Sequence, residues 1–343
     1  MPTLVCYFAR VGDLVMLTPV LRALAAQGPV ELCARPWARP LLGSDPALSA
    51  IHTIDKPNPP WWQELLAGRP RAKLTTVLQS RGYDRIIMLD RETPGIAAWI
   101  RGWAGAIPIT VLPHIAQGTG SHQVDANIAA AEAAGITITD RAPTLTLPAE
   151  LRAEAKQRLA AFGRRVVAIQ AGSSLTHRWL RRQPNLKGLT PQQWSVFCSR
   201  LLSEQQTDAI VFLGSAPEGR EARAIISAMP EGLRSSLHDL TGAVSLAQLP
   251  AFLAGCQACV SVDTGPAHIA AAVGCPLLVI FGPSDPVRFL PRGPGRISAV
   301  VGSAPCRPCL GTRQFKTCRA NICLSTLPAE TLWRSWLSLS SPS

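Results

Sequence analysis

The chain has 343 residues, more than one hydrophobic core usually accommodates, so we expect two domains of roughly 150 to 200 residues. With 47% hydrophobic and 16% charged residues, the composition is that of a globular protein and excludes a disordered one. The net charge is +12. Nearly all of the excess of basic over acidic residues lies after residue 150, where there are 21 Lys and Arg and 10 Asp and Glu.

The first half alternates apolar strand patterns with helical patterns. TLVCYF (3–8) predicts a strand, DLVMLTPVLRALAAQG (13–28) a helix, and PVELCA (29–34) the next strand. DRIIML (84–89) and HQVDANIAAAEAAG (122–135) continue the alternation with a strand and a helix. Such alternation predicts parallel sheets covered by helices on both faces.

The second half repeats the pattern, beginning again with a strand. A helix start is predicted at Thr190 and Pro191, because Thr caps free amides and Pro suits the first helical position. The expected strands and helices are RVVAIQAG (165–172), TPQQWSVFCSRLL (190–202), AIVFLG (209–214), GREARAIISAM (219–229), ACVSV (258–262) and LLVIFG (277–282). We therefore predict an α/β chain of two doubly wound domains, residues 1–155 and 156–325, followed by a C-terminal helix over 326–343.

The N-terminal stretch MPTLVCYFARVGD has Arg10 and Asp13 where a signal peptide would need apolar and small residues. The most apolar run, 96–112, is interrupted by Arg101 and Pro108 and is too short to span a bilayer. We expect a cytoplasmic protein, with peripheral contact at the inner membrane left open.

The basic second half suits binding of a phosphate-bearing ligand or of an anionic membrane face. The alternative interpretation is that these basic residues form a solvated, arginine-rich surface. Nucleic acid is not an expected partner, because the basic residues are scattered and are not interleaved with aromatic residues.

The stretch SVDTGPAHIAAAVG (261–274) has polar residues where a predicted strand meets a predicted helix. A helix start offers free amides and a partial positive charge, and Gly265 lets the backbone approach a ligand, so the corner suits a diphosphate. Asp263 and Thr264 end the strand, and His268 in the first turn would add a hydrogen bond or a positive charge. The alternative is a capping Asp263 and a structural His268.

A second strand-to-helix corner, ARVGDLVMLTP, lies at the front of the chain. Gly12 permits a tight turn there, and Asp13 is expected at the boundary between the strand and its helix. A carboxylate at this edge can remove a proton from a substrate hydroxyl. The other interpretation of Asp13 is a helix cap.

Together the two corners resemble motifs of the bacterial heptosyltransferases, glycosyltransferase family 9. FARVGDLVMLTPVLRAL is similar to the N-terminal motif of that family, and SVDTGPAHIAAAVGCPLLVIFGPSDP to its C-terminal signature. QAGSS, KGLTPQQW and FLGSAPEGREA agree with landmarks between them. The resemblance covers most of the chain and is strongest over residues 166–286.

The resemblance implies a GT-B fold with two Rossmann-like domains facing a central cleft, the first binding acceptor and the second binding nucleotide sugar. In this fold the C-terminal helix returns to the first domain, with Trp333 and Trp336 as its anchors. The implied reaction is an inverting, metal-independent transfer of heptose from ADP-heptose to an inner-core sugar of lipopolysaccharide. Alternatives are another nucleotide sugar, another glycan or a protein acceptor, and a non-catalytic nucleotide-sugar-binding protein.

The family roles transfer to matching positions of this sequence. Asp13 matches the catalytic base, Lys187 the lysine near the donor phosphates, and Glu218 the acidic residue that holds the nucleotide ribose. The other donor-binding positions implied by the resemblance are Ser173, Ser174, Asp263, Thr264, Gly265 and His268.

One segment departs from the family pattern. LTHRWLRRQPNL intervenes between QAGSS and Lys187, so the assignment of Lys187 rests on its seven-residue spacing to Trp194. Either this insertion adds basic contacts to the donor through Arg178, Arg181 and Arg182, or it is an exposed loop.

Acceptor-binding candidates lie in NPPWWQELLAGRPRAK (58–73), together with Gly12 at the first corner. Trp61 and Trp62 can stack on a sugar ring, and Arg69, Arg71 and Lys73 can meet its acidic neighbours. The alternative is two core tryptophans beside a solvated basic turn.

The ten cysteines divide into two groups. Six lie in or beside apolar elements and are expected to be small buried reduced residues: Cys6, Cys33, Cys198, Cys256, Cys259 and Cys275. The other four, Cys306, Cys309, Cys318 and Cys323, lie in CRPCLGTRQFKTCRANIC. That spacing can hold a tetrahedral structural zinc or iron, with reduced thiols or disulfides as alternatives and no cofactor needed for catalysis.

Overall fold

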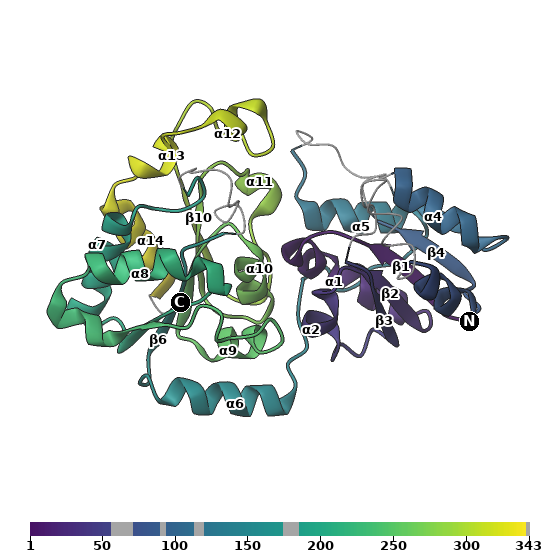
Figure 1. Ribbon diagram of the computed structural model, residues 1–343, viewed down its shortest axis with the longest axis horizontal. Coiled ribbons are helices and arrows are strands. Elements are labelled where there is room, and N and C mark those ends of the chain that lie inside the picture. Colours follow the sequence, from purple (N-terminus) through teal and green to yellow (C-terminus); the bar gives the residue numbers. More distant parts are fainter. Residues whose placement is uncertain (56–70, 90–93, 113–119, 174–184, 341–343) are drawn as a thin grey trace. The chain divides into compact units, whose positions relative to one another are not determined.

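The computed structural model describes residues 1–55, 71–89, 94–112, 120–173 and 185–340, which belong to two compact units, Met1–Thr146 and Leu147–Ser343 (Figure 1). In the described part of each unit, every strand pairing is parallel, as the alternation of strands and helices predicts. No helix within these ranges is both long and apolar enough to cross a membrane.

The first unit contains a sheet in the order β3-β2-β1-β4-β5. Its strands are β1 (Thr3–Tyr7), β2 (Val30–Ala34), β3 (Ala50–Thr53), β4 (Arg85–Met88) and β5 (Ile109–Val111). Its helices are α1 (Val11–Ala25), α2 (Ala38–Leu42), a helix over 71–79, α4 (Pro94–Ala104) and α5 (Gln123–Ala133).

The two faces of this sheet are covered by different helices. Leu4 and Cys6 of β1 pack in one core cluster with Ile96 and Ile100 of α4. Helix α1 instead packs against α5, whose Asn127 donates a hydrogen bond from Nδ2 to the Met16 carbonyl at 3.3 Å. The sheet is therefore buried on both faces, which explains its nearly continuous apolar strands.

The second unit contains a sheet in the order β11-β10-β9-β6-β7-β8. Its strands are β6 (Val166–Gln170), β7 (Ala209–Phe212), β8 (Leu237–Asp239), β9 (Ala258–Val262), β10 (Leu277–Phe281) and β11 (Ile297–Val301). Its α-helices are α6 (Ala149–Ala160), α7 (Pro191–Ser203), α8 (Gly219–Ala228), α9 (Leu249–Gly255), α10 (Gly265–Ala272), α11 (Pro286–Phe289), α12 (Arg313–Thr317), α13 (Ile322–Ser325) and α14 (Ala329–Ser340). Two short 3-10 helices, η1 (Ala216–Glu218) and η2 (Glu231–Ser236), complete it.

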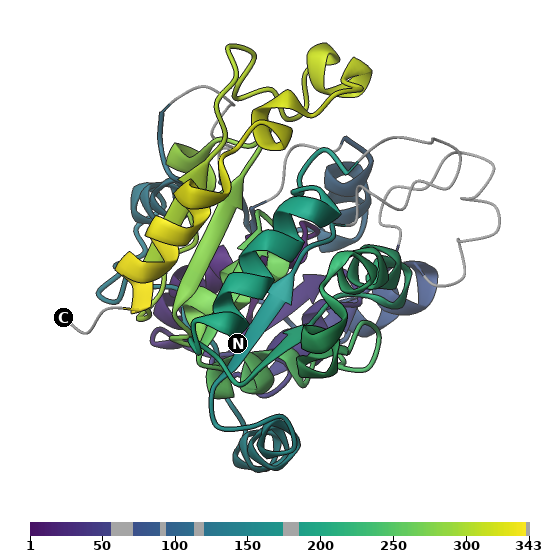
Figure 2. The same cartoon turned by 90° about the vertical axis from the view of Figure 1, so that its left-hand side faces the viewer.

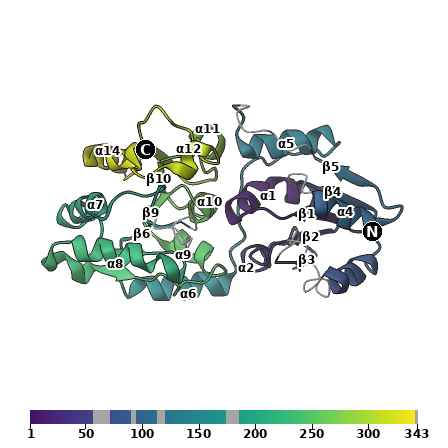
Figure 3. The same cartoon turned by 45° about the horizontal axis from the view of Figure 1, so that its top comes forward.

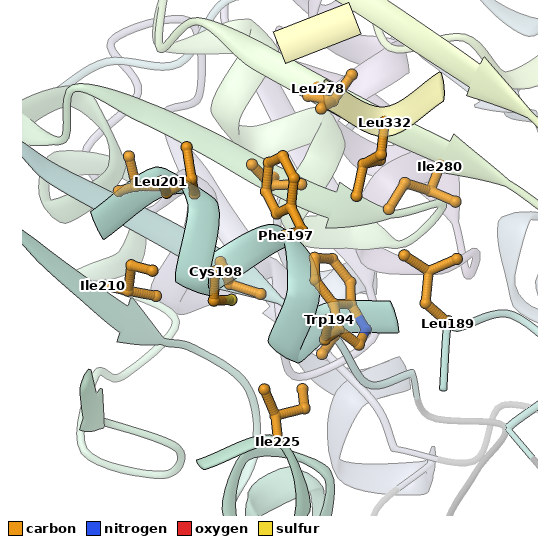
Figure 4. Packing of buried hydrophobic residues seen from close by; sticks show 14 of the residues in the cluster. Leu189, Trp194, Phe197, Cys198, Leu201, Ile210, Ile225, Leu278, Ile280 and Leu332 are labelled. Carbon is orange, nitrogen blue, oxygen red and sulfur yellow. The ribbon is translucent and has the colours of Figure 1, made fainter. Parts of the chain in front are cut away.

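A hydrophobic core of the second unit lies under α7. Trp194 and Phe197 of this helix are almost fully buried among branched aliphatic side chains, including Leu278 and Ile280 of β10 (Figure 4). Figure 3 shows the strands between α7 and α8 on one side and α9 and α10 on the other. The predicted start of α7 is confirmed, since Thr190 Oγ1 accepts from Gln193 N at 3.2 Å and Pro191 is the first helical residue.

The C-terminal helix α14 packs on the second unit, which corrects the expectation that it returns to the first domain. Trp333 and Trp336 are buried in the second-unit core, and their rings meet Phe197 edge-on with centroids 6.4 and 6.2 Å away. Figure 2 shows this yellow helix alongside the strands of the second unit, and it contacts β10, β11 and α7. The apolar stripe of α14 is therefore used to cover its own sheet.

The division between the units falls earlier in the chain than the expected boundary at residue 155. Helix α6 belongs to the second unit because it packs against α9. Gln248 Nε2 donates to Glu154 Oε1 at 2.5 Å, and Arg158 Nη2 donates to the Ala243 carbonyl at 2.9 Å. The polar composition of α6 gave no indication of which domain its few apolar residues would join.

Candidate functional site

The carboxyl ends of β10, β9, β6 and β7 are neighbours along one edge of the second sheet. Because these strands are parallel, the loops that follow them meet at that edge, where ligands bind in open α/β sheets. Asp263 follows β9, Gln170 ends β6, and Ser215 follows β7 closely. The fold thus gathers residues that are far apart in the sequence.

Lys187 and Asp263 form a buried ion pair at this edge. Lys187 Nζ lies 2.9 Å from Asp263 Oδ2 and donates a second hydrogen bond, also 2.9 Å, to the Asp263 carbonyl. Both side chains are less than one-tenth exposed. The structure therefore brings together Lys187, which was chosen by its spacing to Trp194, and the DTGPAH corner that follows β9.

Asp263 is held as a carboxylate by its surroundings. Burial alone would raise the pKa of Asp263, but the charges of Lys187 and His268 and the Ser284 hydroxyl hold that pKa below its ordinary value. The alternative in which Asp263 caps the helix is wrong, because Thr264 is the N-cap residue and the Asp263 carboxylate is paired with Lys187. Ser284, which follows β10, was not among the expected site residues.

Helix α10 starts at Gly265, directly after this pair. The Thr264 side chain makes no capping hydrogen bond; its hydroxyl donates to the Val262 carbonyl at 3.1 Å instead. His268 is buried within the first turn. The start of α10 therefore combines backbone amides, the helix dipole and a lysine, which together favour an anionic ligand.

Glu218 lies at the neighbouring loop and is held on both of its oxygens. Gln170 Nε2 donates to Glu218 Oε1 at 3.0 Å, and Ser215 donates to Oε2 through its amide and hydroxyl, each at 2.7 Å. Glu218 is buried, and its carboxylate lies against two glycines. A Cβ at Gly172 would come within 3.0 Å of Glu218, and Gly214 has φ +144°, so side chains at both positions would disturb the carboxylate.

Asn185 supports the loop that carries Lys187. Its Nδ2 donates to the Ala171 carbonyl at 3.2 Å, and its Oδ1 accepts from the Lys187 amide at 3.2 Å. Ser173, on the loop after β6, is buried. Neither Gln170, the first residue of the quoted QAGSS, nor Asn185, in the insertion LTHRWLRRQPNL, was among the predicted site residues.

The corner of the first unit is organised around Asp13. Its Oδ2 accepts a hydrogen bond from the Arg10 amide at 3.1 Å, so Asp13 does cap the start of α1. Helix α1 begins at Val11, which corrects the expected tight turn at Gly12: this glycine is buried in the first helical turn. The half-buried Asp13 lies in the third helical position, beyond the carboxyl end of β1.

The acceptor-binding candidates are only partly within the described residues. Arg71 lies over the ring of Trp99, 5.7 Å from its centroid, and Lys73 is exposed on the same helix. Outside the described residues lie Ser174, Trp61, Trp62, Arg69, Arg178, Arg181 and Arg182.

The cysteines follow the expected division only in part, because Cys309 and Cys323 of the second group are also buried. All six cysteines assigned to apolar elements are buried, and burial raises the pKa of Cys198, Cys256, Cys259 and Cys275. Cys256 and Cys259 are thus packing residues, as the sequence indicates.

The other four cysteines lie near one another. Burial, together with the nearby Cys306, Cys323 and Cys318, raises the pKa of Cys309 to about 11. Soft thiolate donors suit zinc or iron. In the parts of the chain that the structure describes, however, no three His, Cys, Asp or Glu side chains are arranged to hold a metal ion.

The two parallel sheets define an α/β protein of two doubly wound units. The second unit brings a buried lysine, a helix start and a buried carboxylate to the carboxyl edge of its sheet. The sequence profile of glycosyltransferase family 9 (heptosyltransferase) matches residues 71–318. This match spans more than half of the chain, and the chain belongs to glycosyltransferase family 9.

Similar proteins agree with this family. The chain is 26% identical over 294 residues to lipopolysaccharide heptosyltransferase 2 of Escherichia coli K12, covering 80% of this chain and 81% of the relative. The structure of E. coli ADP-heptose lipopolysaccharide heptosyltransferase II superimposes with a TM-score of 0.76 at 20% identity, over 99% of this chain and 98% of that one. The predicted GT-B fold class is confirmed by this likeness.

A more distant structure shares the fold and differs in size. The iron-containing dodecameric glycosyltransferase TibC from enterotoxigenic E. coli H10407 has a TM-score of 0.56 at 13% identity, over 98% of this chain and 76% of that one.

Proposed function

We propose that this glycosyltransferase transfers heptose from ADP-heptose to a hydroxyl of the lipopolysaccharide inner core, with inversion and without a catalytic metal. The observation that carries the proposal is the buried Lys187–Asp263 pair at the start of α10, beside Glu218. The names of the relatives, which are lipopolysaccharide heptosyltransferases, support the donor and acceptor.

The donor half of the site follows from the chemistry of a nucleoside diphosphate. Glu218 accepts hydrogen bonds from the ribose hydroxyls, and its fixed orientation between Gln170 and Ser215 favours that contact. Lys187 and the first amides of α10 bind the diphosphate. Negative charge grows on the diphosphate as it leaves. The lysine and the amides therefore stabilise the transition state more than they stabilise the bound nucleotide sugar.

The proposed chemical step forms one bond and breaks one. The acceptor oxygen attacks the anomeric carbon, the bond from that carbon to the diphosphate oxygen breaks, and ADP leaves with the electron pair. Asp13 takes the proton of the acceptor hydroxyl as the attack proceeds. Its hydrogen bond from the Arg10 amide orients the carboxylate. Attack opposite to the leaving group inverts the anomeric centre.

The acceptor side of the proposal assigns Gly12, Arg69, Arg71 and Lys73 to the acceptor. Basic side chains there would meet anionic substituents of a core oligosaccharide. The same acceptor places the enzyme at the cytoplasmic face of the inner membrane, and the +12 charge favours peripheral contact with anionic lipid.

We propose a structural role for Cys306, Cys309, Cys318 and Cys323, either as reduced thiols or as ligands of a zinc or iron ion. The nearness of Cys306, Cys318 and Cys323 to Cys309 supports a shared role, and the iron content of TibC gives a precedent for metal on the same fold. Among the described residues, however, no three such side chains are arranged around a metal ion. Metal analysis of protein purified without a histidine tag tests it. A folded, active and metal-free preparation would leave reduced thiols as the explanation.

A panel of nucleotide sugars, measured for binding and for transfer, tests the donor. ADP-heptose is expected to bind and react in preference to UDP- and GDP-sugars. Preference for a UDP- or GDP-sugar would overturn the proposed donor while leaving the family unchanged. Binding without transfer to any acceptor would favour a non-catalytic nucleotide-sugar-binding protein.

Asp13→Asn tests the base. The amide keeps the shape of the cap but cannot take a proton, so we expect kcat to fall by about 100-fold or more, with donor affinity nearly unchanged. Initial rates of ADP release and donor titrations measure the two effects.

Asp125→Asn is the matched control, because Asp125 occupies the same third position in the first turn of α5. Its kcat is expected to stay within about twofold of the unsubstituted enzyme. Full transfer activity of Asp13→Asn would refute the assigned base.

A further inference from the structure

One buried side chain holds both ends of the turn that carries Lys187. Asn321 Nδ2 donates to the Asn185 carbonyl and to the Gly188 carbonyl, each at 2.9 Å. The two acceptors flank Lys187 in the sequence, so a single amide group spans the turn.

The position of Asn321 is strongly determined. It precedes α13 with φ 46° and ψ 38°, a left-handed conformation that asparagine adopts more readily than most residues, and it is buried. Its own carbonyl accepts from the amides of Leu324 and Ser325 at 3.0 and 2.9 Å. These contacts fix the backbone from which the side chain reaches the turn.

The orientation of the Asn321 amide is also determined. Cys323 Sγ donates to Asn321 Oδ1 at 3.4 Å, which leaves Nδ2 facing the two carbonyls. The side chain therefore uses its oxygen and its nitrogen in directed contacts.

The same segment is attached to the start of α7. Gln193 Nε2 donates to the Leu324 carbonyl at 2.9 Å and to the Leu327 carbonyl at 3.0 Å. Within the turn, the Lys187 amide is bonded to Asn185 Oδ1, and Lys187 Nζ reaches Asp263. A continuous set of hydrogen bonds thus leads from Asn321 to the ammonium of Lys187.

We infer that Asn321 is a positioning residue for Lys187 and thereby sets the affinity of the site for the donor diphosphate. This inference rests on the proposed role of Lys187 in donor binding. Asn321 acts through the turn and contacts no substrate. It also links the cysteine-bearing segment to the donor site, because Cys323 orients its amide.

Asn321→Gly tests the inference, because glycine keeps the left-handed backbone without strain and removes both hydrogen bonds. We expect the Kd for ADP and the KM for the donor to rise by about tenfold, the effect of losing about one net hydrogen bond, while kcat changes by less than about threefold. Hydrogen exchange of the amides at 185–188 is expected to accelerate by about tenfold, with the amides of β9 and β10 unchanged.

Thr326→Ala is the matched control. Thr326 follows the same short helix, and its hydroxyl donates to the Ile322 carbonyl at 2.6 Å without reaching the turn at Lys187. Its ADP affinity and its exchange at 185–188 should match those of the unsubstituted enzyme.

Asn321→Asp is a second variant, which keeps the size of the side chain and loses both donors. Unchanged exchange at 185–188 in both variants would overturn the inference. If the amides of β9 and β10 also exchanged faster in both variants, by the same factor as those at 185–188, the inference would be overturned, since Asn321 would then act on the whole unit. Faster exchange at 185–188 alone, in a protein that does not bind ADP, would support the positioning role and refute the proposed donor.

Discussion

At the scale of single residues, the pairing of Lys187 with Asp263 explains why a buried carboxylate is tolerated at the start of α10. The lysine compensates a charge whose burial would otherwise cost several kcal/mol. Pairing also keeps the ammonium at the start of α10, where the helix dipole favours anions. The motif comparison predicted both residues separately, and the structure adds the direct bond between them.

A second buried charge, Glu31 of β2, has a structural role in the first unit. Burial alone would raise the pKa of Glu31, but hydrogen bonds with Arg81, Tyr83 and His52 lower it to about 2 from 4.5. The unfolded chain therefore binds more protons than the folded chain between these values. The stability from ionised Glu31 is complete above about pH 4.5 and is lost as the pH falls toward 2.

Glu31→Gln is expected to lower the free energy of unfolding at pH 7 by at most about 3 kcal/mol, since 1 pKa unit corresponds to about 1.4 kcal/mol. The loss should shrink between about pH 4.5 and pH 2, because Glu31 of the unfolded chain is protonated in this range while the folded carboxylate is still ionised. Urea unfolding at pH 7 and at pH 3 measures both. Glu132→Gln, which removes an exposed ion pair with Arg141, is the control and should change stability by less than about 1 kcal/mol at either pH. A loss that grows at pH 3 would contradict this account.

At the scale of elements, most strands and helices follow from local sequence. The strands predicted within 165–172, 258–262 and 277–282 form as Val166–Gln170, Ala258–Val262 and Leu277–Phe281, with every residue buried. The helix after Thr190 has both its predicted cap and its proline. The start of α1 differs from its prediction because the helix extends two residues before Asp13.

Thr190→Ala is expected to destabilise the second unit by about 1 kcal/mol, because α7 loses its N-cap. For a unit of this size the melting temperature should fall by about 2 to 4 °C, measured by circular dichroism. Thr312→Ala is the control: Thr312 also caps a helix, α12, but that short helix has no buried residue. Its effect should be below about 1 °C. If Thr190→Ala and Thr312→Ala lowered the melting temperature equally, the packing of α7 against the core would not account for the effect of its cap.

At the scale of the whole molecule, each unit has its own parallel sheet and its own core cluster. Helix α14 completes the second core because Leu332, Trp333, Trp336 and Leu339 are buried on its inner face. A C-terminal helix that served only the first domain would leave β10 and β11 without the helix that packs on them beside α7.

Removal of residues 327–343 is therefore expected to abolish cooperative unfolding of a fragment that begins at residue 147. The complete fragment, residues 147–343, should unfold in one transition and retain ADP binding. Urea unfolding followed by tryptophan fluorescence, and ADP titration of each fragment, test this. A cooperative transition in the shorter fragment would show that α14 is dispensable for the second core.

The amino-acid sequence by itself determines the class of fold and the chemical character of the corners. Alternating apolar runs specify parallel strands, and the family motifs identify Asp13, Lys187, Glu218 and Asp263, because these signals depend on residues close together in the chain. The roles assigned to Asp13, to the donor-binding residues, to the acceptor residues and to the metal site remain predictions.

Only the tertiary structure decides which distant residues share a contact. Asn321 is separated from Asn185 by 136 positions, and no periodicity or spacing connects them. The sequence is equally silent about the partner of α14. Its apolar stripe requires that one face of the helix be buried, but does not specify on which sheet the helix packs. Burial requires a partner of complementary shape, and such partners exist only once the parallel sheet has formed.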